Sequence, residues 1–218
     1  VVSHFKTGHF VSEMIASQEL LSGRPGVKQK AELDVNTGNT SVQISGRDPY
    51  TISETAKLVE GLGAKIIDIN MGCPAKKVVS GYAGSALLKD LTLAAKLIEA
   101  VVTSVSVPIT LKTRLGWNEN NLNAPSLAKV AEQLGIKLIT IHARTRCQFY
   151  KGYARWKLVR HVKENVTIPV IVNGDISDAN SARAALKQSK TNGLMVGRAI
   201  RGKPWLLNEI AADLWGYQ

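Results

Sequence analysis

GAKIIDIN, residues 63–70, contains a glycine that ends a helix pattern, an apolar run typical of a strand, and a polar residue at its close. GIKLITIH, residues 135–142, repeats this order. VPITLK at 107–112 and IPVIVN at 168–173 form a second such pair. Repeated units in which a helix end leads into an apolar strand predict alternating helices and parallel strands.

Two architectures suit such a sheet, an open doubly wound sheet and a closed barrel. The repeat runs without reversal and polar residues gather at the strand ends, which favours an α/β fold of the (β/α)8 TIM-barrel type. We expect strands that are apolar on nearly every position, and a first strand that precedes Val1. The predicted strands are His9–Ile15, Thr40–Ser45, Ala64–Asn70, Pro108–Arg114, Lys137–Arg144, Pro169–Asp175 and Asn192–Arg198.

Helix patterns separate these strands. Asp90 is a good N-cap, and Pro125 and Gly135 show the asymmetry expected at helix ends. No linker or low-complexity segment divides the chain, so we expect residues 1–218 to form one partial barrel domain. The predicted helices are 51–62, 90–104, 125–134, 178–187 and 204–214.

The chain has 218 residues and carries a net charge of +11, from 28 Lys and Arg against 17 Asp and Glu. This surplus favours a polyanionic partner such as RNA, although a basic solvated surface gives the same total. No apolar run reaches the ~18–20 residues of a membrane span. Cys73 and Cys147 form neither a disulfide framework nor a zinc motif, which fits a cytoplasmic protein.

Cys73 follows a predicted strand in the turn Gly72-Cys73-Pro74. A thiol at this end of a barrel strand can act as a nucleophile or general acid. The alternative is a buried structural cysteine. The flanking glycine and proline and the preceding polar residues favour a functional role.

Two further strand ends carry cations. Lys112 can stabilise negative charge on a cofactor or substrate, unless its head simply reaches water. His142, Arg144 and Arg146 favour anion or RNA contacts. His4, His9 and His161 have no metal-ligand spacing with His142, so we expect no metal site.

The last two predicted strands suggest a phosphate site. Asn173-Gly174-Asp175 ends one strand and Gly197-Arg198 ends the next. Barrels often bind phosphate beside these loops, where glycines let backbone N–H groups approach and a helix N-terminus adds a positive dipole end.

The segment DINMGCP at 68–74, followed by GYAGSALL at 81–88, resembles the signature of the tRNA-dihydrouridine synthases. HARTRCQ at 142–148, NGDI at 173–176 and GRA at 197–199 fit the same family. The resemblance spans nearly the whole chain, and the bacterial B-type branch is the most similar.

This resemblance implies an oxidoreductase that binds FMN at the barrel mouth and reduces uridine in tRNA to dihydrouridine, with NADPH as reductant. It implies that Cys73 donates a proton to C5 of the uracil, and that Asn70 and Arg144 lie near the flipped-out base. We also expect a monomer without membrane contact. The positions that match family FMN contacts are Gln43, Lys112, His142, Asn173, Gly174, Asp175, Gly197 and Arg198.

Two family features are not in the sequence: a first strand with its FMN-contacting loop, expected before Val1, and a helical tRNA-docking domain, expected after Gln218. We therefore expect truncation at both ends. A smaller departure is Arg155, where an acidic residue is expected. Two alternatives stay open, an inactive remnant and another FMN-barrel reductase that acts on a small pyrimidine or enone.

Overall fold

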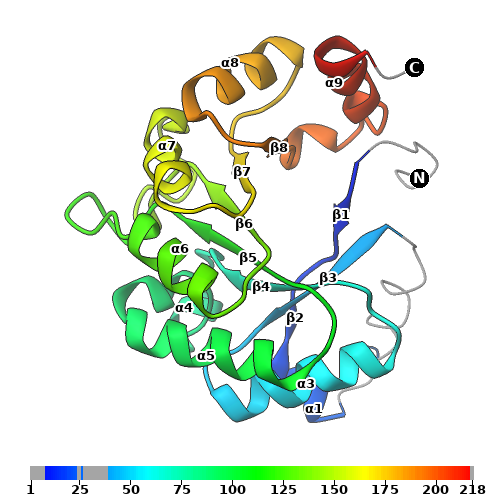
Figure 1. Cartoon of the computed structure of the whole chain (residues 1–218), viewed down its shortest axis with the longest axis vertical. Helices are drawn as coiled ribbons and strands as arrows, with labels where there is room; N and C mark the ends of the chain where they lie inside the picture. Colours follow the sequence, from blue (N-terminus) through cyan, green and yellow to red (C-terminus); the bar gives the residue numbers. More distant parts are fainter. Residues whose placement is uncertain (1–7, 24–25, 27–38, 217–218) are drawn as a thin grey trace.

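The computed structural model describes residues 8–23, 26 and 39–216. The strands form a parallel sheet in the order β1-β3-β4-β5-β6-β7-β8, with β2 also paired to β3. Figure 1 shows helices on the outer side of this curled sheet. The strands are β1 Phe10–Val11, β2 Ile15–Ala16, β3 Thr40–Ser45, β4 Ile67–Met71, β5 Ile109–Arg114, β6 Leu138–His142, β7 Val170–Asn173 and β8 Gly193–Met195.

Helices alternate with the strands, so the architecture is that of a (β/α)8-type barrel, as predicted. In the described part of the chain the sheet ends at β1 and β8. The helices are α1 Ser17–Leu21, α3 Pro49–Gly61, α4 Lys76–Ser80, α5 Leu91–Ser104, α6 Ala124–Gln133, α7 Trp156–Asn165, α8 Ala179–Ser189 and α9 Leu206–Trp215. Two 3-10 helices, η2 Gly84–Lys89 and η3 Arg198–Ile200, complete the set.

The predicted strand at 9–15 is broken into β1 and β2. Val11 pairs with Ser41, whereas Ile15 pairs with Ile44, so the N-terminal strand has one residue more between these pairs than β3. This mismatch is a β-bulge, which bends a strand and increases its twist. Ser12 lies inside it, and its hydroxyl accepts the backbone N–H of Gln43 at 2.9 Å.

Two glutamates explain the internal repeat. The Glu60 carboxylate accepts the backbone N–H groups of Ser106 and Val107, at 2.8 and 3.1 Å. The Glu132 carboxylate accepts those of Thr167 and Ile168 in the same way, at 2.7 and 3.0 Å. Each glutamate lies near the end of one helix and caps the chain that enters a later strand, so the two repeated segments share a tertiary contact.

The helix α7 was not predicted. Only Val159 and Val162 are fully buried in it, and the side chain of its N-cap, Arg155, makes no capping hydrogen bond. Trp156 and Leu158 pack partly buried beside these two valines, so α7 does have an apolar inner face, which the sequence analysis overlooked. The short α4 and both 3-10 helices were missed because local turns carry little periodicity.

The expectation of strands that are apolar on nearly every position is wrong for the inner side of the sheet. Gln43 pairs in register with Asp68, and Asp68 with Thr110. Asn70 pairs with Lys112 in the same way. Alternation places these polar side chains on one face and the apolar residues between them on the other, under the helices.

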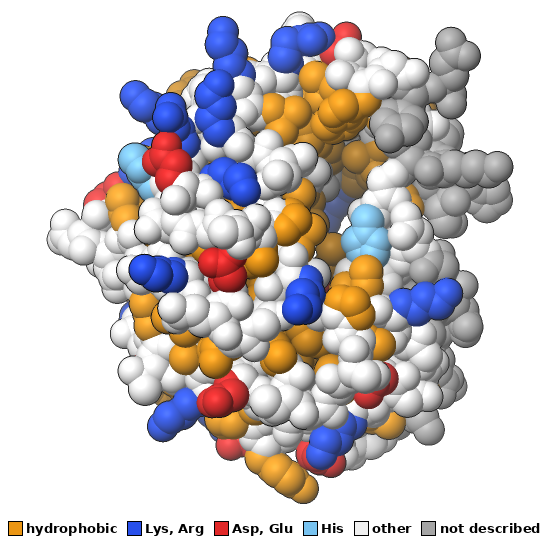
Figure 2. Space-filling view, viewed as in Figure 1, with side chains coloured by type: hydrophobic (Ala, Val, Ile, Leu, Met, Phe, Trp, Pro, Cys, Tyr) orange, Lys and Arg blue, Asp and Glu red, His pale blue; other side chains and the backbone are white. Residues whose placement is uncertain are grey.

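Figure 2 shows Lys and Arg side chains gathered over α7 and α8 on one face of the molecule. No helix in the described ranges has the length and apolar character that a membrane span needs.

Candidate active site at the mouth of the barrel

Cys73 is held in its turn by two neighbours. Asn70 Oδ1 accepts the backbone N–H groups of Gly72 and Cys73, at 3.1 and 2.9 Å. Ser85 donates from its hydroxyl and its backbone N–H to the Cys73 carbonyl, at 2.8 and 3.0 Å. Gly84 has a φ of +59°, and a Cβ there would lie 2.8 Å from the Cys73 carbonyl oxygen. The half-buried thiol is therefore carried on a tightly specified turn.

A buried hydrogen-bond network continues from Asn70 into the barrel. Asn70 Nδ2 donates to Gln43 Oε1 at 2.8 Å, and Gln43 Nε2 donates to Asp68 Oδ2 at 2.7 Å. Thr110 Oγ1 donates to the other carboxylate oxygen of Asp68 at 2.6 Å. Both amides predicted to contact cofactor or base thus also orient the cysteine turn.

Lys112 lies beside this network at the end of β5. Burial lowers the pKa of Lys112, and the nearby Asp68 carboxylate opposes that shift. Burial likewise raises the pKa of Asp68, against the hydrogen bonds from Thr110 and Gln43 and the charge of Lys112. Among the described residues the Lys112 ammonium has no hydrogen bond and no ion pair, so its donors are available to a ligand.

A cavity of about 610 Å³ opens at the carboxyl ends of β5 to β8. Seven of the predicted site residues line it: Lys112, His142, Asn173, Gly174, Asp175, Gly197 and Arg198. Five further lining residues were not predicted as site residues: Tyr150, Ile176, Ser177, Met195 and Ala199. The other four predicted residues, Gln43, Asn70, Cys73 and Arg144, do not line this cavity.

The backbone at Gly174 comes close to His142. Gly174 has a φ of +115°, and a Cβ there would lie 2.9 Å from His142 Cδ2 and 3.1 Å from Ala154 Cβ. The neighbouring Asn173 donates from Nδ2 to the Met195 carbonyl at 2.9 Å, which joins the ends of β7 and β8. Only glycine fits this close approach without strain.

His142 is neutral in this environment. Burial, together with the positive charges of Arg114, Lys112, Arg144 and Arg198, lowers the pKa of His142 to about 2. The neutral imidazole has one N–H donor and one acceptor nitrogen, and its Nε2 lies 3.5 Å from Arg144 Nη1.

Arg144 is 2% exposed and is engaged by the protein itself. Its Nη2 donates to Asp175 Oδ2 and to the Gly152 carbonyl, both at 2.7 Å. Asp175 Oδ2 also accepts the Ala154 N–H at 2.7 Å. The negative charge of Asp175 is thus largely compensated, and Arg144 orders the loop after β6 beside the cavity.

Arg114 is a site residue that the sequence analysis missed. It is 1% exposed, and its Nε donates to the Gly72 carbonyl at 2.8 Å. Its Nη1 donates to the Thr145 and Phe149 carbonyls at 2.9 and 2.8 Å. Burial lowers the pKa of Arg114 to about 10, which leaves it charged at neutral pH. One side chain on β5 therefore ties the cysteine turn to the loop after β6.

Arg155, the departure from the expected acidic residue, has a partner in this structure. Its guanidinium donates to both carboxylate oxygens of Glu119, and its Nη2 also donates to Gln148 Oε1 at 3.2 Å. A basic residue at this position is accommodated because an acidic one lies in the loop after β5.

The part of the chain that the structure describes contains no group of three His, Cys, Asp or Glu side chains placed to hold a metal ion. The cavity is instead lined by the cations Lys112 and Arg198 and by the Asn173 amide, which suit an organic ligand with anionic and carbonyl groups.

The arrangement has counterparts among known proteins. A solved structure of morphinone reductase in complex with tetrahydroNAD superposes with a TM-score of 0.66 over 92% of this chain and 76% of that one. At 11% identity, this likeness shows the barrel fold alone.

Sequence relatives are much more similar. A probable tRNA-dihydrouridine synthase of Rickettsia conorii is 52% identical over 96% of this chain and 64% of its own length. A probable tRNA-dihydrouridine synthase of Rhodobacter capsulatus is 52% identical over 99% of this chain and 67% of its own. The tRNA-dihydrouridine synthase B of Pseudomonas aeruginosa is 45% identical over 93% and 61%.

The chain thus spans about two thirds of the length of the curated relatives it matches. The family model for dihydrouridine synthase (Dus) matches residues 1–217. With half-identical relatives along nearly all of its length, this chain belongs to the dihydrouridine synthase family.

Proposed function

We propose that this chain is the catalytic barrel of a cytoplasmic, FMN-dependent tRNA-dihydrouridine synthase. It reduces uridine in tRNA to 5,6-dihydrouridine, and NADPH is the electron source. The observation that carries the proposal is the fixed Cys73 turn beside a cation-lined cavity of about 610 Å³ in a chain of this family.

The cavity residues fit FMN. The volume of the cavity lies within the ~300–1,000 Å³ range of cofactor sites. The Lys112 ammonium faces it without a protein acceptor, which suits a ligand that gains negative charge. Asn173, Gly174, Gly197 and Arg198 would hold the phosphate end, where Gly174 permits a close backbone approach.

Gln43, His142 and Asp175 complete the proposed cofactor set. Gln43 and His142 would present amide and imidazole groups to the polar edges of the ring system. The charge of Asp175 is already compensated, so Asp175 would act indirectly. It accepts hydrogen bonds from Arg144 and the Ala154 N–H and so fixes the loop beside the cofactor. FMN bound there and reduced by NADPH would supply hydride to C6 of the uracil.

The protein's own part in the reaction is proton delivery. The Cys73 thiol donates a proton to C5 as the C5–C6 double bond is reduced, and solvent returns a proton to the resulting thiolate. Asn70 and Ser85 fix the turn that aims this thiol. Asn70 and Arg144 would act on the base through backbone that they fix: Asn70 through the Cys73 turn, and Arg144 through the loop after β6.

The test compares Cys73→Ala with Cys147→Ala, an exposed cysteine outside the cavity, as the matched control. Unmodified tRNA, FMN and NADPH are supplied, and dihydrouridine is measured by mass spectrometry of the digested RNA. General acids contribute roughly 10²–10⁴ in rate, so Cys73→Ala should lose at least about 100-fold while Cys147→Ala keeps the parent rate. Equal rates in the two variants would remove Cys73 from the reaction.

A parent protein that reduces free uridine or an enone but not tRNA would support the small-substrate reductase instead. A protein that takes up no FMN, seen as missing absorbance bands between about 350 and 500 nm, would contradict the cofactor assignment.

A further inference from the structure

Three side chains from three successive loops meet at the rim of the barrel mouth. Lys89 ends η2, which follows the cysteine turn after β4, and its Nζ lies 3.9 Å from the ring centroid of Trp117. Trp117 belongs to the loop after β5. Arg146, in the loop after β6, places its guanidinium carbon 4.7 Å from the same centroid. We call these three residues the rim cluster.

The positive charges of the rim cluster are not compensated within the described structure. Neither Lys89 nor Arg146 makes a side-chain hydrogen bond or an ion pair there, and Arg146 Nε is buried without an acceptor. Nearby carboxylates are engaged elsewhere, since Asp90 accepts the Leu93 N–H and Glu119 binds Arg155. One indole ring offsets two like charges only in part, so the site favours an anion.

The rim cluster is also preformed. The Arg146 N–H donates to the Gly116 carbonyl at 3.0 Å, and the next residue's N–H donates to the Trp117 carbonyl at 2.9 Å. Asn123 Nδ2 donates to the Leu88 carbonyl at 2.7 Å, which fixes the end of η2 beside the loop after β5. Ordering these loops therefore adds little entropic cost when a ligand binds.

We propose that the rim cluster binds a phosphate of the RNA backbone. The planar guanidinium of Arg146 and the ammonium of Lys89 can both donate hydrogen bonds to the oxygens of a phosphodiester. The cluster follows β4, β5 and β6, whereas the proposed cofactor phosphate lies against the loops after β7 and β8. An RNA strand that delivers a base beside Cys73 therefore meets the rim cluster on the side away from that phosphate.

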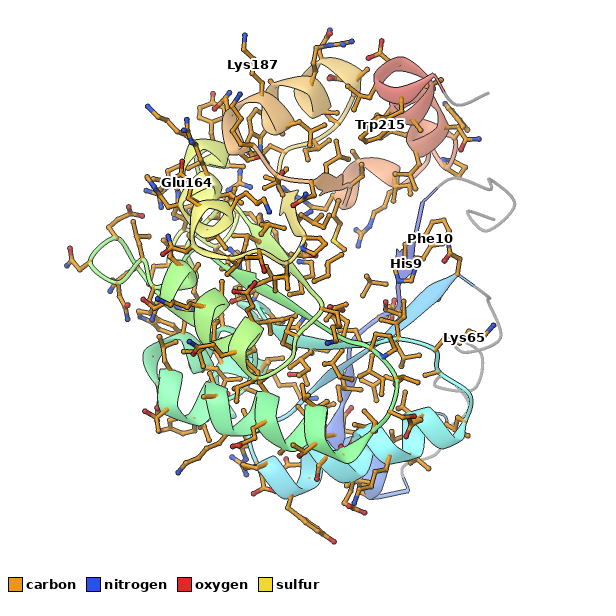
Figure 3. All side chains as sticks on the ribbon, in the orientation of Figure 1. His9, Phe10, Lys65, Glu164, Lys187 and Trp215 are labelled. Carbon is orange, nitrogen blue, oxygen red and sulfur yellow. The ribbon has the colours of Figure 1, made fainter. Side chains whose placement is uncertain are left out.

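This inference rests on the RNA substrate of the proposed function but not on the reaction. Its test uses the double variant Lys89→Met/Arg146→Met and measures the dissociation constant for an unmodified tRNA transcript over a salt series. The matched control is Lys163→Met/Lys187→Met, which removes the same charge from the last turns of α7 and α8. Figure 3 shows Lys187 on the outer surface of its helix.

The rim double variant should weaken tRNA binding about tenfold near 0.1 M salt. It should also reduce the magnitude of the slope of log K against log salt by about one, because one phosphate contact contributes close to one counterion. The control should change neither quantity by more than about a quarter as much. A charge-keeping variant, Lys89→Arg/Arg146→Lys, should restore the slope, which a merely structural role would not predict.

Equal losses in the rim and control variants would overturn the proposal, because they would reflect total charge alone. An unchanged slope in the rim variant would overturn it as well, and so would a parent protein that does not bind tRNA. A failed reaction with the slope difference intact would remove the proposed catalysis and leave the phosphate site standing.

Discussion

Arg144 Nη2 lies 2.7 Å from Asp175 Oδ2, in an ion pair whose arginine is 2% exposed. The pair joins the loop after β6 to the end of β7, two segments that both border the cavity. The Arg144 side chain also binds the Gly152 carbonyl, so the pair fixes backbone as well as charge.

Removing one partner of this pair should destabilise the protein. Arg144→Met leaves Arg198, 3.8 Å away, as the remaining cation beside Asp175 and should lower the free energy of unfolding by about 2 kcal/mol. Asp175→Asn keeps a hydrogen-bond acceptor and should cost less than Arg144→Met. Urea unfolding followed by circular dichroism measures both. A loss below about 1 kcal/mol for Arg144→Met would show that the pair is not a stabilising contact.

Gly174→Ala should damage the cavity more than an ordinary glycine substitution does. The added methyl group would approach His142 Cδ2 to 2.9 Å at a φ of +115°. Gly202→Ala is the control, because Gly202 also has a positive φ, +76°, but nothing lies within 4 Å of the added carbon.

Backbone strain alone should cost Gly202→Ala about 1 kcal/mol, while Gly174→Ala should lose more than that and bind FMN at least about tenfold more weakly. Calorimetric unfolding and flavin titration separate the two effects. Similar behaviour of the two variants would mean that His142 moves aside without cost.

His142 should make the protein less stable in acid. Its pKa is about 2 in the folded state and about 6.5 when unfolded, so the unfolded chain binds the extra proton between these values. The contribution of His142 to the free energy of unfolding is fully present above pH 6.5 and is lost as the pH falls toward 2. Between pH 6 and 4 the parent should lose up to about 1.4 kcal/mol per pH unit more than His142→Asn.

Denaturant titrations at several pH values test this difference between the two curves. Parallel curves would show that the imidazole becomes protonated in the folded protein, against the expected effect of burial and the surrounding cations.

The paired glutamates should stabilise the barrel at neutral pH and not in acid. Hydrogen bonds from Ser106 lower the pKa of Glu60, and those from Thr167 and Ile168 lower the pKa of Glu132. A carboxyl group with a lowered folded pKa contributes stability above its unfolded pKa and loses it as the pH falls through the folded value.

Glu60→Gln and Glu132→Gln should therefore lower the melting temperature at pH 7 and have a smaller effect below about pH 4. Glu99→Gln, an exposed position on α5, provides the control. A decrease that persists unchanged into acid would point to lost packing rather than lost charge.

The barrel could be predicted from the sequence because the patterns that indicate its strands and helix ends lie in short continuous segments. Each of the four repeated segments ends on a polar residue, and the repeated glycines at 63 and 135 adopt the positive φ of a helix end, +102° and +104°. Seven of the eleven predicted site residues line one cavity, since parallel strands bring their carboxyl ends to one edge.

The roles of several arginines could not be predicted from the sequence, because they depend on contacts between loops that are far apart along the chain. Arg114 acts through backbone carbonyls at 72, 145 and 149, which no spacing or residue type in the sequence indicates. The burial of Arg144 follows in the same way from Asp175 and Gly152. The pairing of Arg155 with Glu119 likewise becomes visible only when the two loops are placed side by side.

The hydrogen bonds of the Arg114 guanidinium limit which loops of the barrel mouth can be replaced by loops from related proteins. A loop transplanted alone from another barrel need not place a backbone carbonyl within hydrogen-bonding distance of Arg114. Chimeras should fold when residues 72–149 are transferred as one block, and should fail when a crossover separates the cysteine turn from the loop after β6. The loops after β4 and β6 are therefore coupled through one side chain on β5, and they should be exchanged together.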